Sequence, residues 1–295
     1  MHFTLRQHTQ DFLMHCRQKG HTKGTLAAYK VSLDKFLTYA DEAGVTRAED
    51  VTRQLMRSYA NHLSEVLSPG AAHARLRPVK TFFLWLEADE VLEKSPMRRV
   101  PMPKLPHKIL PAIDAEQVQQ LMDTARGTRH PLRDRAVLAV LFDTGVRVSE
   151  LCGLQLEDVQ TGGRLHIRNA KGGRGRIVPI SRAGLRHLTR YINTERPETR
   201  LPEVFLANDE TPLNRDSVKQ MLERLCRSAG LPVFTPHTFR RGFAVNYLRN
   251  SGDVFSLQRI LGHTTLEMTN RYAVLQDEDL KDVHRRASPM SALKR

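Results

Sequence analysis

A tyrosine and several basic side chains stand in the second half of the 295-residue chain, where turns and helix starts are expected. His263 directly follows a glycine, and Tyr272 stands nine residues further on. Between them, Thr264 and Glu267 have the spacing of a capping box, in which a hydroxyl and a carboxylate each bind a free backbone amide. We therefore expect a turn that carries His263, followed by a helix that carries Tyr272 about two turns in.

Two arginines stand close to expected helix starts. Arg147 lies between apolar neighbours, where an arginine is costly to bury unless it is paired, and Glu150 three residues on is its natural partner. His237 and Arg240 share one face of a helix that Thr235 is expected to cap. A planar guanidinium suits a phosphate, and a histidine beside an arginine at a helix start forms an anion site. A structural ion pair and an ordinary helix start are the alternatives.

A β-hairpin with a glycine-rich basic turn is expected between these two motifs. Its strands cover residues 164–169 and 176–180, which alternate in polarity or carry β-branched side chains. Lys171 stands where the first strand ends, and Arg174 and Arg176 are the competing bases of the turn. The turn lacks the order of residues of a nucleotide-binding P-loop, so we expect no ATP site. An exposed turn lysine is the alternative for Lys171.

The first hundred residues show helical periodicity, which predicts a small bundle. Either Thr22 or Thr25 is expected to cap the second helix, and Gly44 to end it. On the fourth helix, the residues predicted to face inward are Leu76, Val79, Phe82, Phe83 and Leu86. The basic residues around that helix, Arg75, Arg77 and Lys80, either contact phosphates or form a solvated basic face. The expected helices cover residues 1–20, 22–44, 53–67 and 71–88.

Residues 95–111 contain five prolines among several basic residues, including Lys104. Proline at this density disfavours helix and sheet and favours an extended, stiff connector. We place the domain boundary here, between a helical domain of residues 1–104 and a second domain of residues 105–295. A basic connector between two basic domains suits a clamp around a rod-shaped anion, and a plain spacer is the alternative.

The second domain is predicted to be mainly helical, with the hairpin as a small β-sheet. Asp114 is expected to cap its first helix, and the apolar run at residues 132–142 reads as a buried helix that Gly145 ends. Residues 203–207 fit a short buried strand or an extended piece. The other predicted helices cover residues 115–125, 183–193 and 216–229. The fold class is therefore mainly α, with an α+β second domain.

Composition points to a polyanionic partner. Lys and Arg number 46 against 32 Asp and Glu, a net charge of +14 and a sequence pI near 10.1, which is typical of proteins that bind nucleic acid. The three cysteines are isolated, which favours a reducing compartment over a disulfide framework or a zinc site. No apolar run is long enough to span a bilayer and no signal peptide is evident, so we expect a cytoplasmic protein.

Taken together, these motifs resemble the tyrosine recombinase (phage integrase) family, in its order and with its spacings. Leu84-Trp-Leu86 and the segment around Lys104 extend the resemblance into the first domain, so that it covers nearly the whole chain. Length and layout are most similar to Xer-type resolvases and transposon or phage integrases. The motifs are Thr144-Gly-Val-Arg-Val-Ser-Glu-Leu151, Lys171 in its hairpin, His237-Thr-Phe-Arg240, Leu261-Gly-His263 and Arg271-Tyr272.

The resemblance implies site-specific cleavage and rejoining of DNA through a 3′-phosphotyrosyl intermediate, with Tyr272 as nucleophile. The two arginines would clamp the non-bridging oxygens, Lys171 would protonate the leaving 5′ oxygen, His237 would assist proton transfer and His263 would bond the phosphate. Asn169-Ala170 stands before the lysine where the family often has a glycine. The catalytic set is Arg147, Lys171, His237, Arg240, His263 and Tyr272, supported by Glu150. Expected DNA contacts are Arg75, Arg77, Lys80, Lys104, Arg174, Arg176 and Arg241.

The resemblance also implies the partners. We expect double-stranded DNA, a homotetramer in the synaptic complex that forms from monomers or dimers, and an accessory protein as a further candidate. Neither a metal nor another cofactor is expected. The tail after Ala273 carries Leu275, Leu280 and Val283 at loosely helical spacing; it docks either on a neighbouring subunit or on its own domain. A type IB topoisomerase-like relaxase and a non-catalytic architectural DNA-binding protein are the alternative functions.

Overall fold

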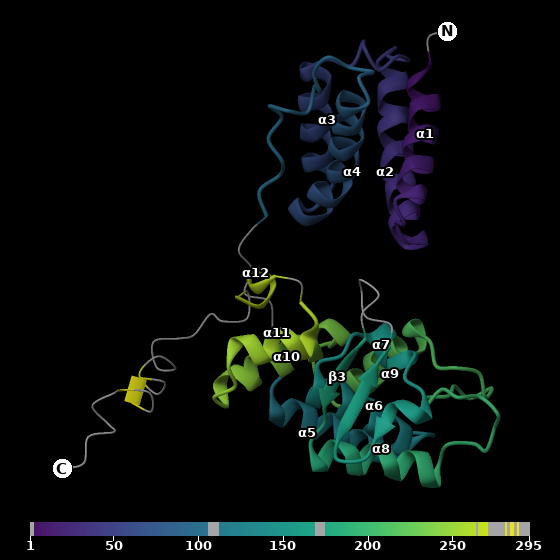
Figure 1. The fold of residues 1–295 in the computed structure, drawn as a ribbon, viewed down its shortest axis with the longest axis vertical. Coiled ribbons are helices and arrows are strands. Elements are labelled where there is room, and N and C mark those ends of the chain that lie inside the picture. Colours follow the sequence, from purple (N-terminus) through teal and green to yellow (C-terminus); the bar gives the residue numbers. More distant parts are fainter. Residues whose placement is uncertain are drawn as a thin grey trace. The chain divides into compact units, whose positions relative to one another are not determined.

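The computed structural model describes residues 3–105, 112–168, 175–263 and 265–270, together with 281, 284, 285 and 288. The chain divides into two compact units, Met1–Ile109 and Leu110–Arg295 (Figure 1). The predicted fold class, mainly helical with a small sheet, is confirmed. The domain boundary between residues 104 and 105 stays a prediction.

Within residues 3–105 the structure forms four helices, and a hydroxyl side chain caps the N-terminus of each. Thr4, Thr22, Thr52 and Ser68 each accept a hydrogen bond from a backbone amide of the first turn. The fourth helix begins earlier than predicted, because Ser68 caps it and a proline fits the first turn. The helices are α1 (Leu5–Gln18), α2 (Lys23–Glu42), α3 (Arg53–Val66) and α4 (Pro69–Ala88).

The core of the first unit lies where α4 packs against α1, α2 and α3. Phe36 of α2 meets Phe83 of α4 edge-on, with ring centroids 5.5 Å apart. This packing holds α4, and with it the basic residues predicted to contact DNA, on a rigid scaffold. All five residues predicted to face inward on α4 are fully buried: Leu76, Val79, Phe82, Phe83 and Leu86.

The proline-rich segment is not an extended connector along its whole length, which corrects the prediction. Met97 is fully buried and Val100 is 4% exposed, and both belong to the core of the first unit. His73 Nδ1 on α4 lies 3.0 Å from the carbonyl oxygen of Pro103. The prolines exclude helix and strand, but the apolar residues between them still gain free energy from burial.

The second unit is built around α6 (Pro131–Thr144), which Figure 1 shows in the midst of the other helices. Residues 136–141 of α6 are almost completely buried, as the apolar run predicted. The Glu195 carboxylate, just after α8 (Arg182–Thr194), accepts hydrogen bonds from the backbone amides of Leu132 and Arg133. A carboxylate at this end satisfies free donors and complements the helix dipole.

The second unit contains seven further helices within its described residues, and several of them pack against α6. Asp114 caps α5 and Thr235 caps α10, as predicted. The helix α11 was not predicted, because the sequence analysis of this region considered only the motif that begins at Leu261, the last residue of the helix. Besides α6, they are α5 (Ala115–Thr124), α7 (Val148–Cys152), α8 (Arg182–Thr194), α9 (Arg215–Ser228), α10 (Pro236–Arg249), α11 (Val254–Leu261) and α12 (Leu266–Asn270), with 3-10 turns at Ala125–Gly127 and Leu156–Asp158.

The described residues contain one three-stranded antiparallel sheet in the order β1-β2-β3. The β2–β3 hairpin was predicted, whereas β1 is too short to show a periodicity. Leu165 pairs with Val178 and both are buried, while Ile167 pairs with Arg176 at the end next to the turn. The strands are β1 (Val159–Gln160), β2 (Arg164–Ile167) and β3 (Arg176–Pro179).

Residues 203–207 are an extended piece and not a strand of this sheet. Val204 and Phe205 are fully buried, and Glu203 makes an isolated bridge to Gln155. Among the helices that the structure describes, none is long and apolar enough to cross a membrane.

Candidate active site

Arg147 is the residue that precedes α7, and its side chain is fixed by Glu150. The guanidinium Nη1 donates to Glu150 Oε1 at 3.0 Å, and the Arg147 backbone amide donates to Glu150 Oε2 at 2.8 Å. The Arg147 side chain is 23% exposed and that of Glu150 only 1%. The ion pair suggested by the spacing is therefore present, and it leaves part of the guanidinium open to solvent.

Glu150 is held in its ionised form by its neighbours. Burial alone would raise its pKa, but hydrogen bonds from Arg176 and the Arg147 backbone, with the charges of both arginines, bring the pKa below its ordinary 4.5. A buried carboxylate with such partners stays charged at neutral pH. It can therefore orient cations throughout the physiological range.

Arg240 lies on α10 and is 4% exposed. Its Nη1 donates to the Gly145 carbonyl at 2.6 Å, and its Nη2 donates to the Leu261 carbonyl at 2.7 Å. These carbonyls orient the guanidinium without neutralising it. Gly145 stands two residues before Arg147, so one tight turn connects the two arginines.

That turn depends on glycine. Gly145 has a φ of +59°, and a Cβ added there would lie 2.4 Å from Phe243 Cδ1 on α10. Only glycine accepts this backbone conformation without strain and also permits so close an approach. The turn therefore lies directly against α10 and helps to set the spacing of the two arginines.

His263 stands beside Arg240. Its Nε2 lies 3.1 Å from Arg240 Nη2, and its Nδ1 lies 2.9 Å from Thr269 Oγ1 on α12. An arginine cannot accept a hydrogen bond, so Nε2 is the acceptor and Nδ1 carries the proton that Thr269 receives. Thr269 is fully buried. This threonine was missed from the sequence, where nothing marks a contact between the turn and the following helix.

Both histidines of the site have lowered pKa values. Burial, followed by the charges of Arg240, Arg147 and Arg176, lowers the pKa of His263 to about 4. The pKa of the more exposed His237, in the first turn of α10, is lowered by partial desolvation and then by nearby arginines. Both imidazoles are therefore neutral at pH 7. The site combines two oriented guanidinium groups with two neutral bases.

Part of the predicted site lies outside the described residues. This applies to the proposed nucleophile Tyr272, to Lys171, to Arg174 and to the capping residue Thr264. The described part of the site therefore joins four of the six predicted catalytic residues: Arg147, His237, Arg240 and His263.

The predicted DNA contacts occupy different environments. Arg77 and Lys104 are exposed, whereas Arg75, Lys80 and Arg241 are partly buried. Arg176 is only 11% exposed and both of its terminal nitrogens bind Glu150.

Comparison with known proteins agrees with this combination of fold and site. Residues 111–279 match the phage integrase family, and residues 9–90 match the phage integrase N-terminal SAM-like domain. The chain belongs to the phage integrase family and is an enzyme of the tyrosine recombinase class.

Individual relatives cover almost the whole chain. Tyrosine recombinase XerC 2 of Ralstonia nicotianae is 32% identical over 92% of this chain and 82% of that protein. Tyrosine recombinase XerC of Myxococcus xanthus is 31% identical over 96% of both chains. The Tn1549 transposon integrase, solved in complex with transposon right end DNA, has a TM-score of 0.78 at 19% identity and covers 96% of this chain and 99% of that one. That last likeness supports the fold.

Proposed function

We propose that this recombinase cuts and rejoins double-stranded DNA at specific sites, with Tyr272 as the nucleophile. The observation that carries the proposal is the pair of oriented guanidinium groups, Arg147 and Arg240, joined by the Gly145 turn. Two fixed guanidinium groups match the non-bridging oxygens of a phosphodiester, on which negative charge grows during attack.

The proposed reaction conserves the energy of the bond that it breaks. The Tyr272 oxygen attacks phosphorus, a 3′-phosphotyrosyl bond forms, and the bond from phosphorus to the 5′ oxygen breaks while Lys171 supplies a proton to that oxygen. A 5′-hydroxyl then attacks the phosphotyrosine in the reverse sense and releases the tyrosine. Because the covalent intermediate retains the bond energy, rejoining needs no ATP.

The two neutral histidines suit different tasks. His237 is exposed and has a lowered pKa, so it can accept the proton that Tyr272 loses. His263 accepts from Arg240 in the described arrangement, and so it holds that guanidinium in place. The hydrogen bond from His263 to the phosphate that the resemblance implies would require the other tautomer of its ring.

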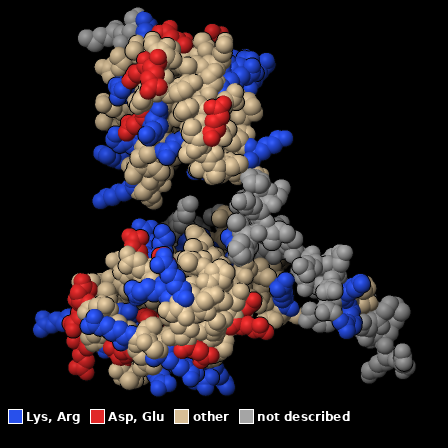
Figure 2. Space-filling model, turned by 180° about the vertical axis from the view of Figure 1, so that it is seen from behind, with Lys and Arg blue, Asp and Glu red and all other residues tan. Residues whose placement is uncertain are grey.

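Basic side chains on both units support binding to DNA. Figure 2 shows Lys and Arg distributed over each unit and interspersed with acidic residues. Arg77 of the first unit also lines a shallow groove with small and hydroxyl residues near the starts of α2 and α4, including Thr22, Thr25 and Gly70. Small side chains let a backbone approach closely, which suits a phosphate chain.

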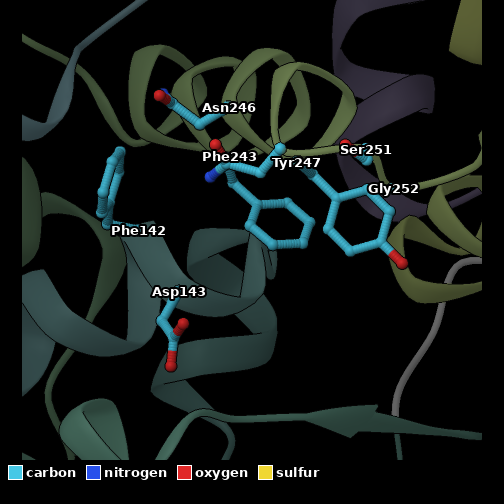
Figure 3. Close-up of a pocket in the computed structure, with 8 residues that line it drawn as sticks. Phe142, Asp143, Phe243, Asn246, Tyr247, Ser251 and Gly252 are labelled. Atoms are coloured by element: carbon cyan, nitrogen blue, oxygen red, sulfur yellow. The ribbon is translucent and has the colours of Figure 1, made fainter. Parts of the chain in front are cut away.

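We further propose that the protein assembles as a tetramer on DNA through its C-terminal tail, most of which lies outside the described residues. A pocket of about 460 Å³ between α6 and α10 offers a place for it. Figure 3 shows the rings of Phe243 and Tyr247 at this pocket, with Phe142 and Asp143 on the α6 side. These rings suit the apolar residues near the end of the tail, such as Val283, Met290 and Leu293.

Mixing two defective proteins tests the tail proposal. One variant ends after Asp282 and keeps the pocket, and the other carries Tyr247→Ser and keeps the tail. If docking occurs between subunits, each variant alone binds DNA but does not form a synapse, and their mixture partly regains synapsis. Wild-type synapsis by the truncated protein alone would contradict the proposal.

A plasmid with two copies of a candidate site tests the overall function. The recombinase is expected to produce resolved circles, and only when both copies have matching sequence. Relaxation of supercoils without strand exchange, on DNA of any sequence, would favour the topoisomerase-like alternative instead.

A further inference from the structure

Arg176, the first residue of β3, is tied to two other parts of the second unit. Its Nη1 and Nη2 donate to the two oxygens of Glu150, each at 2.9 Å, and its Nε donates to the carbonyl of Ile260 at 2.7 Å. Two parallel bonds from one guanidinium to one carboxylate are the strongest and most directional form of ion pair. One side chain therefore connects the hairpin to α7 and to α11.

Glu150 is shared between two arginines. The carboxylate that binds Arg176 also receives the backbone amide and the Nη1 of Arg147. With its side chain 1% exposed, Glu150 cannot rotate away without leaving a charge buried and unpaired. The position of Arg147 therefore depends on Arg176 through this common carboxylate.

The other side of the Arg176 guanidinium presses against the end of α11. A Cβ added to Gly262, whose φ is +65°, would lie 3.2 Å from Cδ and Nε of Arg176. The neighbouring carbonyl of Leu261 receives Arg240, and the next residue is His263. Arg176 thus supports both halves of the cationic site, the Arg147 half and the Arg240 half.

A phosphate contact is incompatible with this arrangement. The nitrogens that would approach DNA as a planar fork already bind Glu150, and the side chain is 11% exposed. We propose that Arg176 is a positioning residue of the recombination site, which holds Glu150 and the end of α11 so that Arg147 and Arg240 meet the phosphate correctly. This inference rests on the proposed function and replaces the DNA-contact role expected from the sequence.

Charge-conserving substitution separates the two roles. Arg176→Lys keeps the positive charge but cannot make two parallel bonds to Glu150. We expect it to slow single-turnover formation of the phosphotyrosyl adduct on the order of 100-fold, because small misplacements of a phosphate clamp have effects of this size. Arg164→Gln, an exposed change in the same hairpin, is the control and should retain the wild-type rate. Wild-type cleavage by Arg176→Lys would overturn the proposal.

Salt dependence supplies a second readout. Each phosphate contact contributes about 0.9 to the slope of log affinity against log salt concentration. Arg176→Gln is expected to leave this slope equal to that of the wild type, although cleavage is abolished. A slope reduced by about 0.9 in Arg176→Gln would assign the side chain to DNA contact and reject the positioning role.

DNA with an uncharged group at the cleavage position tests how Arg176→Lys slows cleavage. It distinguishes misplacement of Arg147 and Arg240, which bind the phosphate charge, from a loss of folding. Methylphosphonate DNA has a methyl group in place of one non-bridging oxygen and lacks the charge that the clamp binds. On this DNA the ratio of wild-type to Arg176→Lys cleavage rates should fall towards one. An unchanged ratio would indicate a general structural defect and overturn the proposal. If the wild type forms no adduct on any DNA, the proposed function itself fails, a result distinct from either of these.

Discussion

At the scale of single residues, the proposed catalysis depends on the geometry of two guanidinium groups. Arg147 and Arg240 are each held by acceptors fixed in the fold, Glu150 for one and two backbone carbonyls for the other. Such preset donors need no reorganisation when charge grows on the phosphate, which is where electrostatic catalysis is most effective.

Conservative changes at these arginines should therefore be severe. Arg147→Lys or Arg240→Lys is expected to lower the single-turnover cleavage rate by about 10²–10³-fold with little change in DNA affinity, since a lysine retains charge but not the oriented fork. The matched control is Arg249→Lys, an exposed change on the same helix as Arg240. Cleavage that is no slower than in the control would contradict the clamp.

His263 gives the second prediction at this scale, a dependence of stability on pH. Its pKa is about 4 in the folded protein against an ordinary value of 6.5, so between these values the unfolded chain binds a proton that the folded chain does not. Stability contributed by the neutral imidazole is therefore lost as the pH falls from 6.5 towards 4.

A pair of substitutions isolates this effect. His263→Gln retains an acceptor and a donor but cannot titrate, and its melting temperature should decline less than that of the wild type between pH 7 and pH 4.5. His21→Gln, at an exposed histidine of the first unit, should follow the wild type. Parallel curves for wild type and His263→Gln would show that this imidazole is not held neutral.

The sequence predicted most of the residues that the fold brings together at this scale, but not all of the contacts that hold them. Arg147, His237, Arg240 and His263 were recognisable from residue type and spacing. Arg176 was assigned to DNA because a basic residue beside a glycine-rich turn gives no sign of burial. Its contacts with Glu150 and Ile260 join segments far apart in the sequence, and only the fold can bring these together.

At the scale of elements, the turn between α6 and α7 and the end of α11 decide where the cations lie. Gly145→Ala forces a β-carbon into Phe243 and places alanine at a positive φ. We expect a loss of about 1–3 kcal/mol in the free energy of unfolding, measured by urea denaturation. Gly127→Ala, at a position with no heavy atom within 4 Å, is the control. Equal stability of the two variants would contradict the steric argument.

The helices were predictable where periodicity and capping agreed, and less so elsewhere. Capping residues Asp114 and Thr235 marked true helix starts, and the buried run of α6 was evident from composition. The helix α11 is short and β1 has only two residues, so neither shows a clear periodicity of apolar residues. In the proline-rich segment the prolines exclude helix and strand, so the sequence shows no periodicity from which the burial of Met97 could be predicted.

At the scale of the whole molecule, a net charge of +14 divided over both units predicts salt-sensitive binding to DNA. The triple variant Arg75→Gln, Arg77→Gln, Lys80→Gln should lower the slope of log affinity against log salt by roughly 0.9 for each phosphate that the variant no longer neutralises. The control carries glutamine at three other exposed basic residues of α1 and α2, namely Arg6, Lys30 and Lys35. Equal slopes for the two variants would mean that α4 does not contact the phosphates.

Covalent trapping tests the central claim most directly. Wild-type protein and Tyr272→Phe are incubated in EDTA with DNA nicked close to the cleavage position, and the products are separated on denaturing gels. We predict a protein–DNA adduct with the wild type that Tyr272→Phe does not form. Two results would contradict tyrosine transesterification by this site. One is an adduct that Tyr272→Phe still forms, and the other is tight DNA binding by the wild type without any covalent protein–DNA adduct.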